Sequence, residues 1–283
     1  MPSSNPAFGR GFARAGSGQG YPGTGTAGWG PAPQGYGAPG SGAPGYGAPA
    51  DPYAAPSPYA RPATRFMTMD DVVTKTGVSF LVMVVTAALT WALPGFAGAA
   101  LALPAVLIAL VLGLVIAFKQ IAHPAATLSY AALYGVALGA ISEVFEAQFG
   151  RGIVMQAVIG TFGVFAGMLV VYKTGAIRVT PKFTRWLLGA MIGVLVLVVV
   201  NLIASFITPG GLGLRSGGGL AIVFSLVVIG VAALSLLLDF DMADQAIRRG
   251  APAKFAWYVA FGLLVTIVWL YLEILRLLSY FRE

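Results

Sequence analysis

Six carboxylates lie within or beside the long apolar stretches of this chain, where ionisable side chains are rare. An ionisable group at bilayer depth costs at least about 2.5 kcal/mol, so such groups usually face a protein interior or water and mark an ion or proton pathway. Carboxylate oxygens are also the ligands that a hard cation such as Ca²⁺ prefers. Proton and cation exchange is therefore the chemistry to consider for Glu143, Glu146, Asp239, Asp241, Asp244 and Glu273.

Three of these acids stand in the segment SLLLDFDMADQAIRR, which ends at Arg249. At 100° per residue, Asp239 and Asp241 differ by about 200° around a helix, so we expect only one of them to face inward. Asp244 lies three residues after Asp241 and four before Arg248. That spacing predicts a solvated cluster of charges at the end of the helix.

Glu273 lies well inside the last apolar stretch and has two interpretations. Arg276, one turn later, would form an ion pair within the helix. Alternatively, Glu273 meets an aspartate of the preceding helix. Two carboxylates close together in a poorly solvated site cannot both ionise cheaply, so such a pair titrates as a unit and acts as a pH switch. Glu143 and Glu146 either belong to an ion pathway or ring the outer mouth of a helix bundle.

The elements that must position these acids are membrane helices. Of 283 residues, 58% are apolar and 10% are charged, whereas soluble domains have about 45–50% and 25%. Apolar runs of about 20 residues span a hydrocarbon core, and lipid forces such spans to be helical. The sequence predicts seven spans, near 77–94, 99–118, 125–147, 153–172, 186–207, 219–239 and 256–281.

Basic residues predict the orientation of these spans. Of the 17 Lys and Arg residues, all but Arg151, Arg215, Arg276 and Arg282 fall on the side of the N-terminal segment. The positive-inside rule therefore places the N-terminus in the cytoplasm. The net charge of +7 is explained by cytoplasmic loops facing anionic membrane lipid, and it requires no nucleic-acid partner.

Residues 1–65 differ in composition from the rest of the chain. They are rich in Gly, Pro, Ala and Tyr and lack apolar periodicity, so we expect a disordered cytoplasmic tail. The tail is either a plain linker or a site for weak contacts with a protein partner. Residues 66–283 form the predicted seven-helix transmembrane domain.

Catalytic and metal-binding sites are not indicated. The chain has no Cys and a single His, which excludes thiolate and multi-histidine metal sites. His123 lies beside Pro124 at an expected helix start, away from an obvious nucleophile. No nucleotide-binding motif occurs in the sequence. We therefore expect neither an enzyme nor a resident cofactor.

Small residues repeat in two of the expected helices. Gly135 and Gly139 form one pattern of small residues four apart, and Gly163 and Gly167 form another. Such patterns let helices approach closely. Packing within the bundle is the favoured interpretation, with a dimer interface as the alternative.

Several segments together resemble the transmembrane Bax inhibitor motif (Bax inhibitor-1-like) family. They are LLLDFDMADQAIRRG, VWLYLEILRLLSYF, LYGVALGAISEVFEAQ, VMQAVIGTFGVFAGMLVVYKTG and DVVTKTGVSFLVMVVTAALTW. The resemblance covers about residues 66–283. It implies an all-α bundle in which six helices surround a central seventh.

The resemblance to this family also implies a function. A bacterial member would be a multi-pass protein of the plasma (inner) membrane and a pH-sensitive calcium leak channel. An acid on the sixth helix, Asp239 or Asp241, and Glu273 on the seventh would share a proton and latch the pore, and Glu143 matches the family's third-helix acid. The alternatives are a non-conducting regulator that binds a membrane protease or another partner, and a proton-coupled solute transporter.

Overall fold

The computed structural model describes residues 65–93, 97–208 and 211–282. The predicted disordered tail lies outside the described residues, apart from Arg65. Within the described part of the chain there are seven long α-helices, one short 3-10 helix and no β-strand. Their bounds are α1 Met69–Trp91, α2 Ala97–Lys119, α3 Pro124–Phe149, α4 Ile153–Thr174, α5 Pro181–Ser205, α6 Gly218–Arg248, η1 Ala253–Phe255 and α7 Ala256–Tyr280.

All seven α-helices are long and apolar enough to cross a membrane, which confirms the predicted number of spans. Two helices extend well beyond their predicted bounds. α1 begins at Met69 rather than at residue 77, because Thr68 and Asp71 form a capping box there. α6 continues to Arg248 rather than ending at residue 239, so its acidic segment is helical and reaches out of the apolar region.

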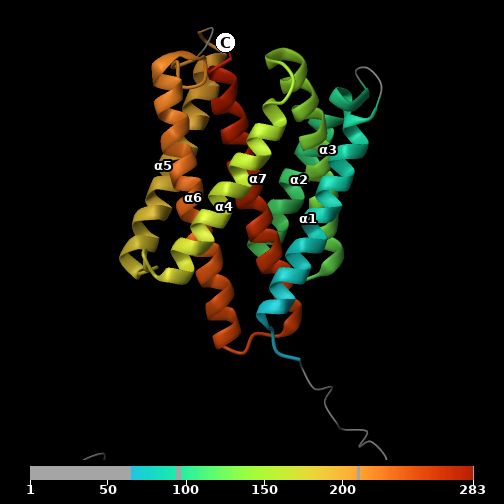
Figure 1. The fold of residues 1–283 in the computed structure, drawn as a ribbon, viewed down its shortest axis with the longest axis vertical. Helices are drawn as coiled ribbons and strands as arrows, with labels where there is room; N and C mark the ends of the chain where they lie inside the picture. The colour runs from blue at the N-terminus through green and yellow to red at the C-terminus, as the bar shows by residue number, and fades with distance from the viewer. Residues whose placement is uncertain (1–64, 94–96, 209–210, 283) are drawn as a thin grey trace, which may run out of the picture. The chain divides into compact units, whose positions relative to one another are not determined.

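The last helix occupies the centre of the bundle, as predicted. In Figure 1, α5 and α6 lie on one side of α7 and α1 to α3 on the other, while α4 crosses in front. α7 contacts α1, α3, α4 and α6, and 67% of its span is buried, against 17% for α1 and α5. Leu264, Leu270 and Leu275 are wholly buried.

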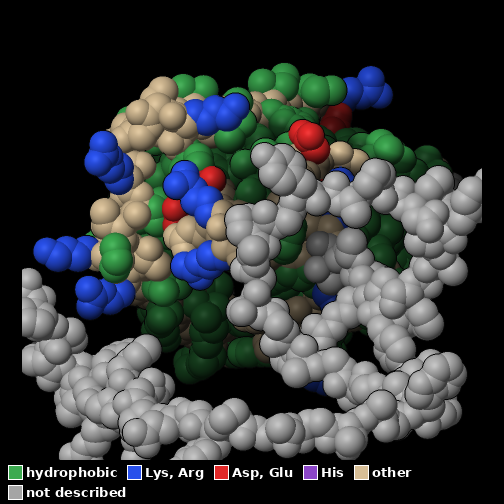
Figure 2. Space-filling model, turned by 90° about the horizontal axis from the view of Figure 1, so that it is seen from below, with side chains coloured by type: hydrophobic (Ala, Val, Ile, Leu, Met, Phe, Trp, Pro, Cys, Tyr) green, Lys and Arg blue, Asp and Glu red, His purple; other side chains and the backbone are tan. Residues whose placement is uncertain are grey.

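Successive helices alternate in direction, so the charged loops gather at two ends of the bundle. We call the end where α1 begins and α6 finishes the lower end, as it is drawn in Figure 1. Figure 2 shows that Lys and Arg outnumber Asp and Glu on the visible part of this lower face. Arg151 and Arg215 lie in the connections at the opposite, upper end.

One of the two glycine patterns packs helices together. A Cβ atom at Gly135 would lie 2.3 Å from the carbonyl oxygen of Met83, and one at Gly139 would lie 2.3 Å from that of Ala87. The backbones of α3 and α1 therefore touch where these side chains are missing. A Cβ atom at Gly163 would meet nothing within 4 Å, and the same holds at Gly167, so this second pair does not pack α4 within the bundle.

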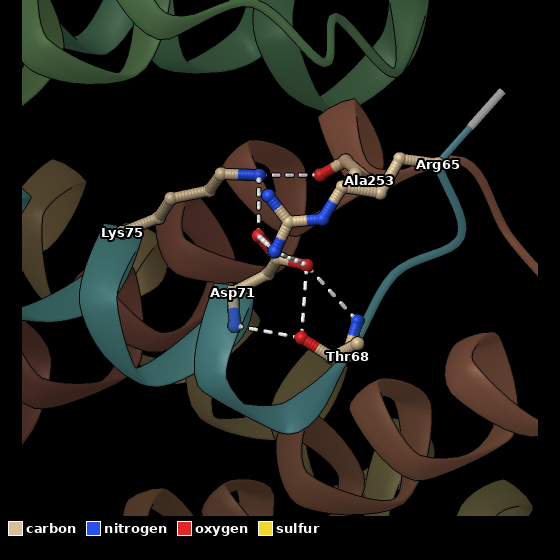
Figure 3. A network of polar contacts seen from close by, with 5 residues as sticks. All are labelled: Arg65, Thr68, Asp71, Lys75 and Ala253. Carbon is tan, nitrogen blue, oxygen red and sulfur yellow. Dashed lines mark hydrogen bonds and ion pairs between the residues drawn. The ribbon is translucent and has the colours of Figure 1, made fainter. Parts of the chain in front are cut away.

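A polar network fixes the start of α1 (Figure 3). The carboxylate of Asp71 accepts hydrogen bonds from the backbone N–H and the hydroxyl of Thr68 and forms ion pairs with Arg65 and Lys75 at 3.3 and 3.7 Å. Lys75 also donates to the carbonyl oxygen of Ala253. The first two turns of α1 are thereby joined to η1, just before α7.

Backbone pairing strengthens this connection. The N–H of Met67 donates to the carbonyl oxygen of Ala251, and the N–H of Ala253 donates to that of Arg65, both at 2.8 Å. Residues 65–67 therefore run antiparallel to residues 251–253. We call this pairing the lower strap. It ties the chain that enters α1 to the connection between α6 and α7.

Candidate functional site

Asp239 lies against the central helix. It stands in the lower half of α6, and its Oδ2 accepts a 2.6 Å hydrogen bond from the hydroxyl of Thr266 on α7. Gly262, one turn before Thr266, lies beside the same carboxylate, and a Cβ atom there would make an ordinary contact of 3.7 Å with Asp239 Oδ1. Among the described residues, Asp239 takes part in no ion pair. Its partner is thus a hydroxyl group, not a cation.

A cavity of about 510 Å³, lined by both polar and apolar side chains, reaches Asp239 at the lower end of α6. Asp241 and the exposed side chains of Gln245 and Arg249 lie further along its wall. Arg249 donates to Gln245 at 2.7 Å, and Gln245 in turn donates to the carboxylate of Asp241. Asp239 therefore marks the inner part of this cavity and Asp241 its outer part. We call it the lower cavity.

Glu273 does not meet either α6 aspartate, so the predicted carboxylate pair is wrong for this structure. Its side chain is buried, and its Oε1 accepts from Arg215 at 3.0 Å and from Arg276 at 3.1 Å. Glu273 follows Thr266 by seven residues, which places it roughly 10 Å further along α7 at 1.5 Å per residue. The physical reason is charge balance, because two guanidinium groups compensate a buried carboxylate far better than a second carboxylate would.

The cluster of Glu273, Arg215 and Arg276 carries one excess positive charge. Arg276 was the alternative partner that the sequence predicted for Glu273, one turn away on the same helix. Arg215 reaches Glu273 from the connection between α5 and α6. Burial and the neighbouring Arg276 lower the pKa of Arg215 below its ordinary value, and Glu273 acts in the opposite direction. Glu273 Oε2 and Arg215 Nε are buried without a hydrogen-bond partner among the described residues.

The remaining predicted acids, Asp244, Glu146 and Glu143, are all half-buried, and the first two have a polar partner. Asp244 pairs with Arg248 at 2.9 Å, which confirms the expected contact at the end of α6. Glu146 accepts a 3.2 Å hydrogen bond from the N–H of Gly152, just before α4. Glu143 is half-buried on α3 near the start of α2, where a Cβ atom at Gly98 would lie 3.1 Å from its Oε2.

The charged groups of the bundle thus form separate sites on α6 and α7. The lower cavity holds Asp239 and Asp241, and the Glu273 cluster lies about two helical turns further toward the upper end. Within the described ranges, no group of three or more His, Cys, Asp or Glu side chains is arranged to hold a metal ion. The arrangement suits transient ligation of a hydrated cation by oxygens rather than tight metal binding.

Two functional contacts were not foreseen from the sequence. Thr266 is one of few polar residues in α7, and its polarity was the only sign in the sequence that it contacts another polar side chain. Arg215 lies in the Gly-rich segment TPGGLGLRSGGG, 58 residues before Glu273. No local spacing relates two residues so far apart, so only the packing of the helices brings them together.

Comparison with known proteins gives one clear match. The sequence model of a family described as Bax inhibitor 1 like matches residues 5–283. The match therefore includes most of the N-terminal segment, which the resemblance drawn from the helices had left out. No curated protein matches the chain.

Proposed function

The chain is a multi-pass membrane protein of the Bax inhibitor 1 like family, and we propose that it is a pH-sensitive cation leak channel with Ca²⁺ as the permeating ion. The proton-sensitive group in this proposal is the single carboxyl group of Asp239. No catalytic step and no resident cofactor are involved, and Ca²⁺ is cargo. The proposal rests on the position of Asp239 between the lower cavity and the central helix, with a hydroxyl partner and no cationic one among the described residues.

Ionised Asp239 would attract a cation into the lower cavity. Carboxylate oxygens of Asp239 and Asp241 and the amide oxygen of Gln245 are ligands that suit Ca²⁺. A proton on Asp239 removes this charge. The other charged groups on the cavity wall are Asp241 and Arg249, whereas α5 and α7 contribute the hydroxyls of Thr184 and Thr266. We therefore expect cation flux to fall as Asp239 becomes protonated.

The Glu273 cluster would close the upper half of the path. Its excess positive charge repels a cation, and Oε1 of Glu273 is already paired with both Arg215 and Arg276. Arg215 is attached to a connection rather than to a helix, so it can move without disturbing α7. In this proposal the structure corresponds to a channel that is accessible from the lower end and shut at the upper end.

The cellular placement is also part of the proposal. Basic side chains gather at the lower end of the bundle, as expected for the cytoplasmic side of a bacterial inner membrane protein. The lower cavity would then open to the cytoplasm and the Glu273 cluster would face the outside.

Calcium flux into proteoliposomes, measured between about pH 5 and pH 8, tests the proposal. We expect Asp239→Asn to remove the pH dependence of the flux. Asp70→Asn is the matched control, since Asp70 is exposed at the start of α1 and is not among the residues that line the lower cavity. Unchanged pH dependence in Asp239→Asn, or no flux above that of empty liposomes in the wild type, would contradict the proposal.

One observation favours a second candidate, a non-conducting regulator that binds a membrane protease or another partner. The lower strap joins the chain before α1 to residues 251–253, beside the lower cavity, so a partner held by the N-terminal segment would act on the end of α6. Removal of residues 1–64 distinguishes the proposed channel from the proposed regulator. Loss of a cellular activity in this deletion, with Asp239→Asn fully active, would favour the regulator.

A further inference from the structure

A long apolar groove runs between α1 and α4 on the side of the bundle that faces lipid. In Figure 1 these two helices diverge toward the lower end, with α7 behind them. The groove contains a lower space of about 490 Å³ and an upper space of about 250 Å³. Both spaces are lined by Phe80 and Phe162, whose rings meet edge to face at 5.5 Å. This aromatic pair forms a waist in a single groove.

The lower space has the length of one membrane leaflet. Along α4 it extends from Thr161 to Lys173, which is roughly 18 Å at 1.5 Å per residue. Half of a hydrocarbon core is about 15 Å. Its walls are almost entirely apolar, with Phe165 and Leu169 of α4 facing Phe240 of α6. An acyl chain of the lower leaflet matches this space in length and in chemistry.

Polar groups occur at the lower end of the space, where a lipid headgroup would lie. Lys173, in the last turn of α4, is the one charged residue among those that line it. Thr76 lines the same space, and its hydroxyl oxygen is buried without a hydrogen-bond partner in the described part of the chain. Two carboxylates lie near Tyr172 on this wall: Asp244 is paired with Arg248, and Asp241 is hydrogen-bonded to Gln245. Lys173 supplies the charge on the wall itself, and that charge favours an anionic headgroup.

We propose that the groove between α1 and α4 binds one anionic glycerophospholipid of the lower leaflet. Its acyl chain lies along the lower space up to the waist formed by Phe80 and Phe162. Its phosphate contacts Lys173, and an ester carbonyl accepts a hydrogen bond from the hydroxyl of Thr76. The lipid would touch Phe240, the residue next to Asp239, but the proposal does not depend on cation conduction.

The binding can be measured by native mass spectrometry of the full chain, delipidated in detergent and titrated with phosphatidylglycerol or with phosphatidylcholine of the same acyl chains. We expect one retained phosphatidylglycerol per chain. Lys173→Gln should weaken its binding about fivefold, the equivalent of about 1 kcal/mol for one basic residue near anionic lipid. Lys182→Gln, an exposed residue of α5 outside the groove, is the matched control and should bind as the wild type does.

A second pair of variants tests the acyl-chain site itself. Gly77 lines the lower space, and a Cβ atom there would meet nothing within 4 Å, so Gly77→Leu should fill the space and displace the lipid. Gly163→Leu adds the same side chain to open space outside the groove and should leave binding unchanged. Thr76→Val, which keeps the shape of the side chain, serves if Gly77→Leu does not fold, and it should weaken binding. The proposal is overturned if Gly77→Leu or Thr76→Val retains the lipid like the wild type, or if phosphatidylcholine binds equally well, which indicates annular lipid only.

Discussion

Replacing Glu273 by Gln should destabilise the bundle more than removing either of its arginine partners. Gln has nearly the same shape, so packing is kept, but the charge of the Glu273 cluster rises from +1 to +2. Both arginine nitrogens lie about 3 Å from the same carboxylate oxygen, so the two guanidinium groups would repel each other at close range. Breaking a buried pair costs about 3–5 kcal/mol.

The expected magnitude is smaller than this range because the cluster is only partly shielded from water. The side chains of Arg215 and Arg276 are each 28% exposed, so solvent screens part of the repulsion. We expect a loss of about 2–3 kcal/mol for Glu273→Gln, which corresponds to a fall of about 4–12 °C in Tm for a domain of this size. Arg215→Gln leaves Glu273 paired with Arg276 and should cost about 1 kcal/mol or less.

Thermal unfolding of purified protein in detergent measures these differences. The double variant Glu273→Gln with Arg215→Gln removes the repelling pair and should be more stable than Glu273→Gln alone. Asp244→Asn is the control, since it breaks an ion pair with an arginine side chain that is 77% exposed. Equal losses for Glu273→Gln and Arg215→Gln, or a double variant no more stable than Glu273→Gln, would refute the assigned charge balance.

Three further predictions concern contacts between helices. Gly139→Leu should prevent the close approach of α3 to α1 and leave little folded protein in size-exclusion chromatography, whereas Gly163→Leu should fold normally because its Cβ position is open. Tyr271→Phe removes a buried 2.7 Å hydrogen bond to Ser142 and should cost about 0.6 kcal/mol, with about 1.7 kcal/mol as an upper value, in chemical denaturation. Thr266→Val removes the hydroxyl that contacts Asp239. It should shift the pH dependence of calcium flux in proteoliposomes without abolishing it. An unchanged profile would show that Thr266 takes no part in the proposed gate.

The number and order of the spans could be predicted because each depends on local composition. Twenty apolar residues between polar loops determine a membrane helix whatever its neighbours are. The bounds were less accurate where polar residues continue a helix beyond the lipid. Hydropathy ends α6 near Asp239, but pairs such as Asp244 with Arg248 support about two and a half further helical turns.

The partners of the acids were harder to predict. The sequence indicated that Glu273 needs a compensating group, and Arg276 was found by its spacing on the same helix. The aspartates of α6 were expected as partners because the resemblance to the family implies a proton shared between acids of the sixth and seventh helices. Which turn of α6 faces which turn of α7 is set by side-chain packing between the two helices, and no local pattern encodes that register.

The lower strap also imposes an order on biosynthesis. After Met67 has been added to the growing chain, the ribosome must add about 186 more residues before Ala253 exists. At about 5–20 residues per second, this takes roughly 10–40 s. Six helices have been made by then, so the first helix enters the bilayer before the partner of its leading segment is available. The two backbone hydrogen bonds at 2.8 Å are thus a late event in assembly, and they distinguish a finished chain from one that stopped early.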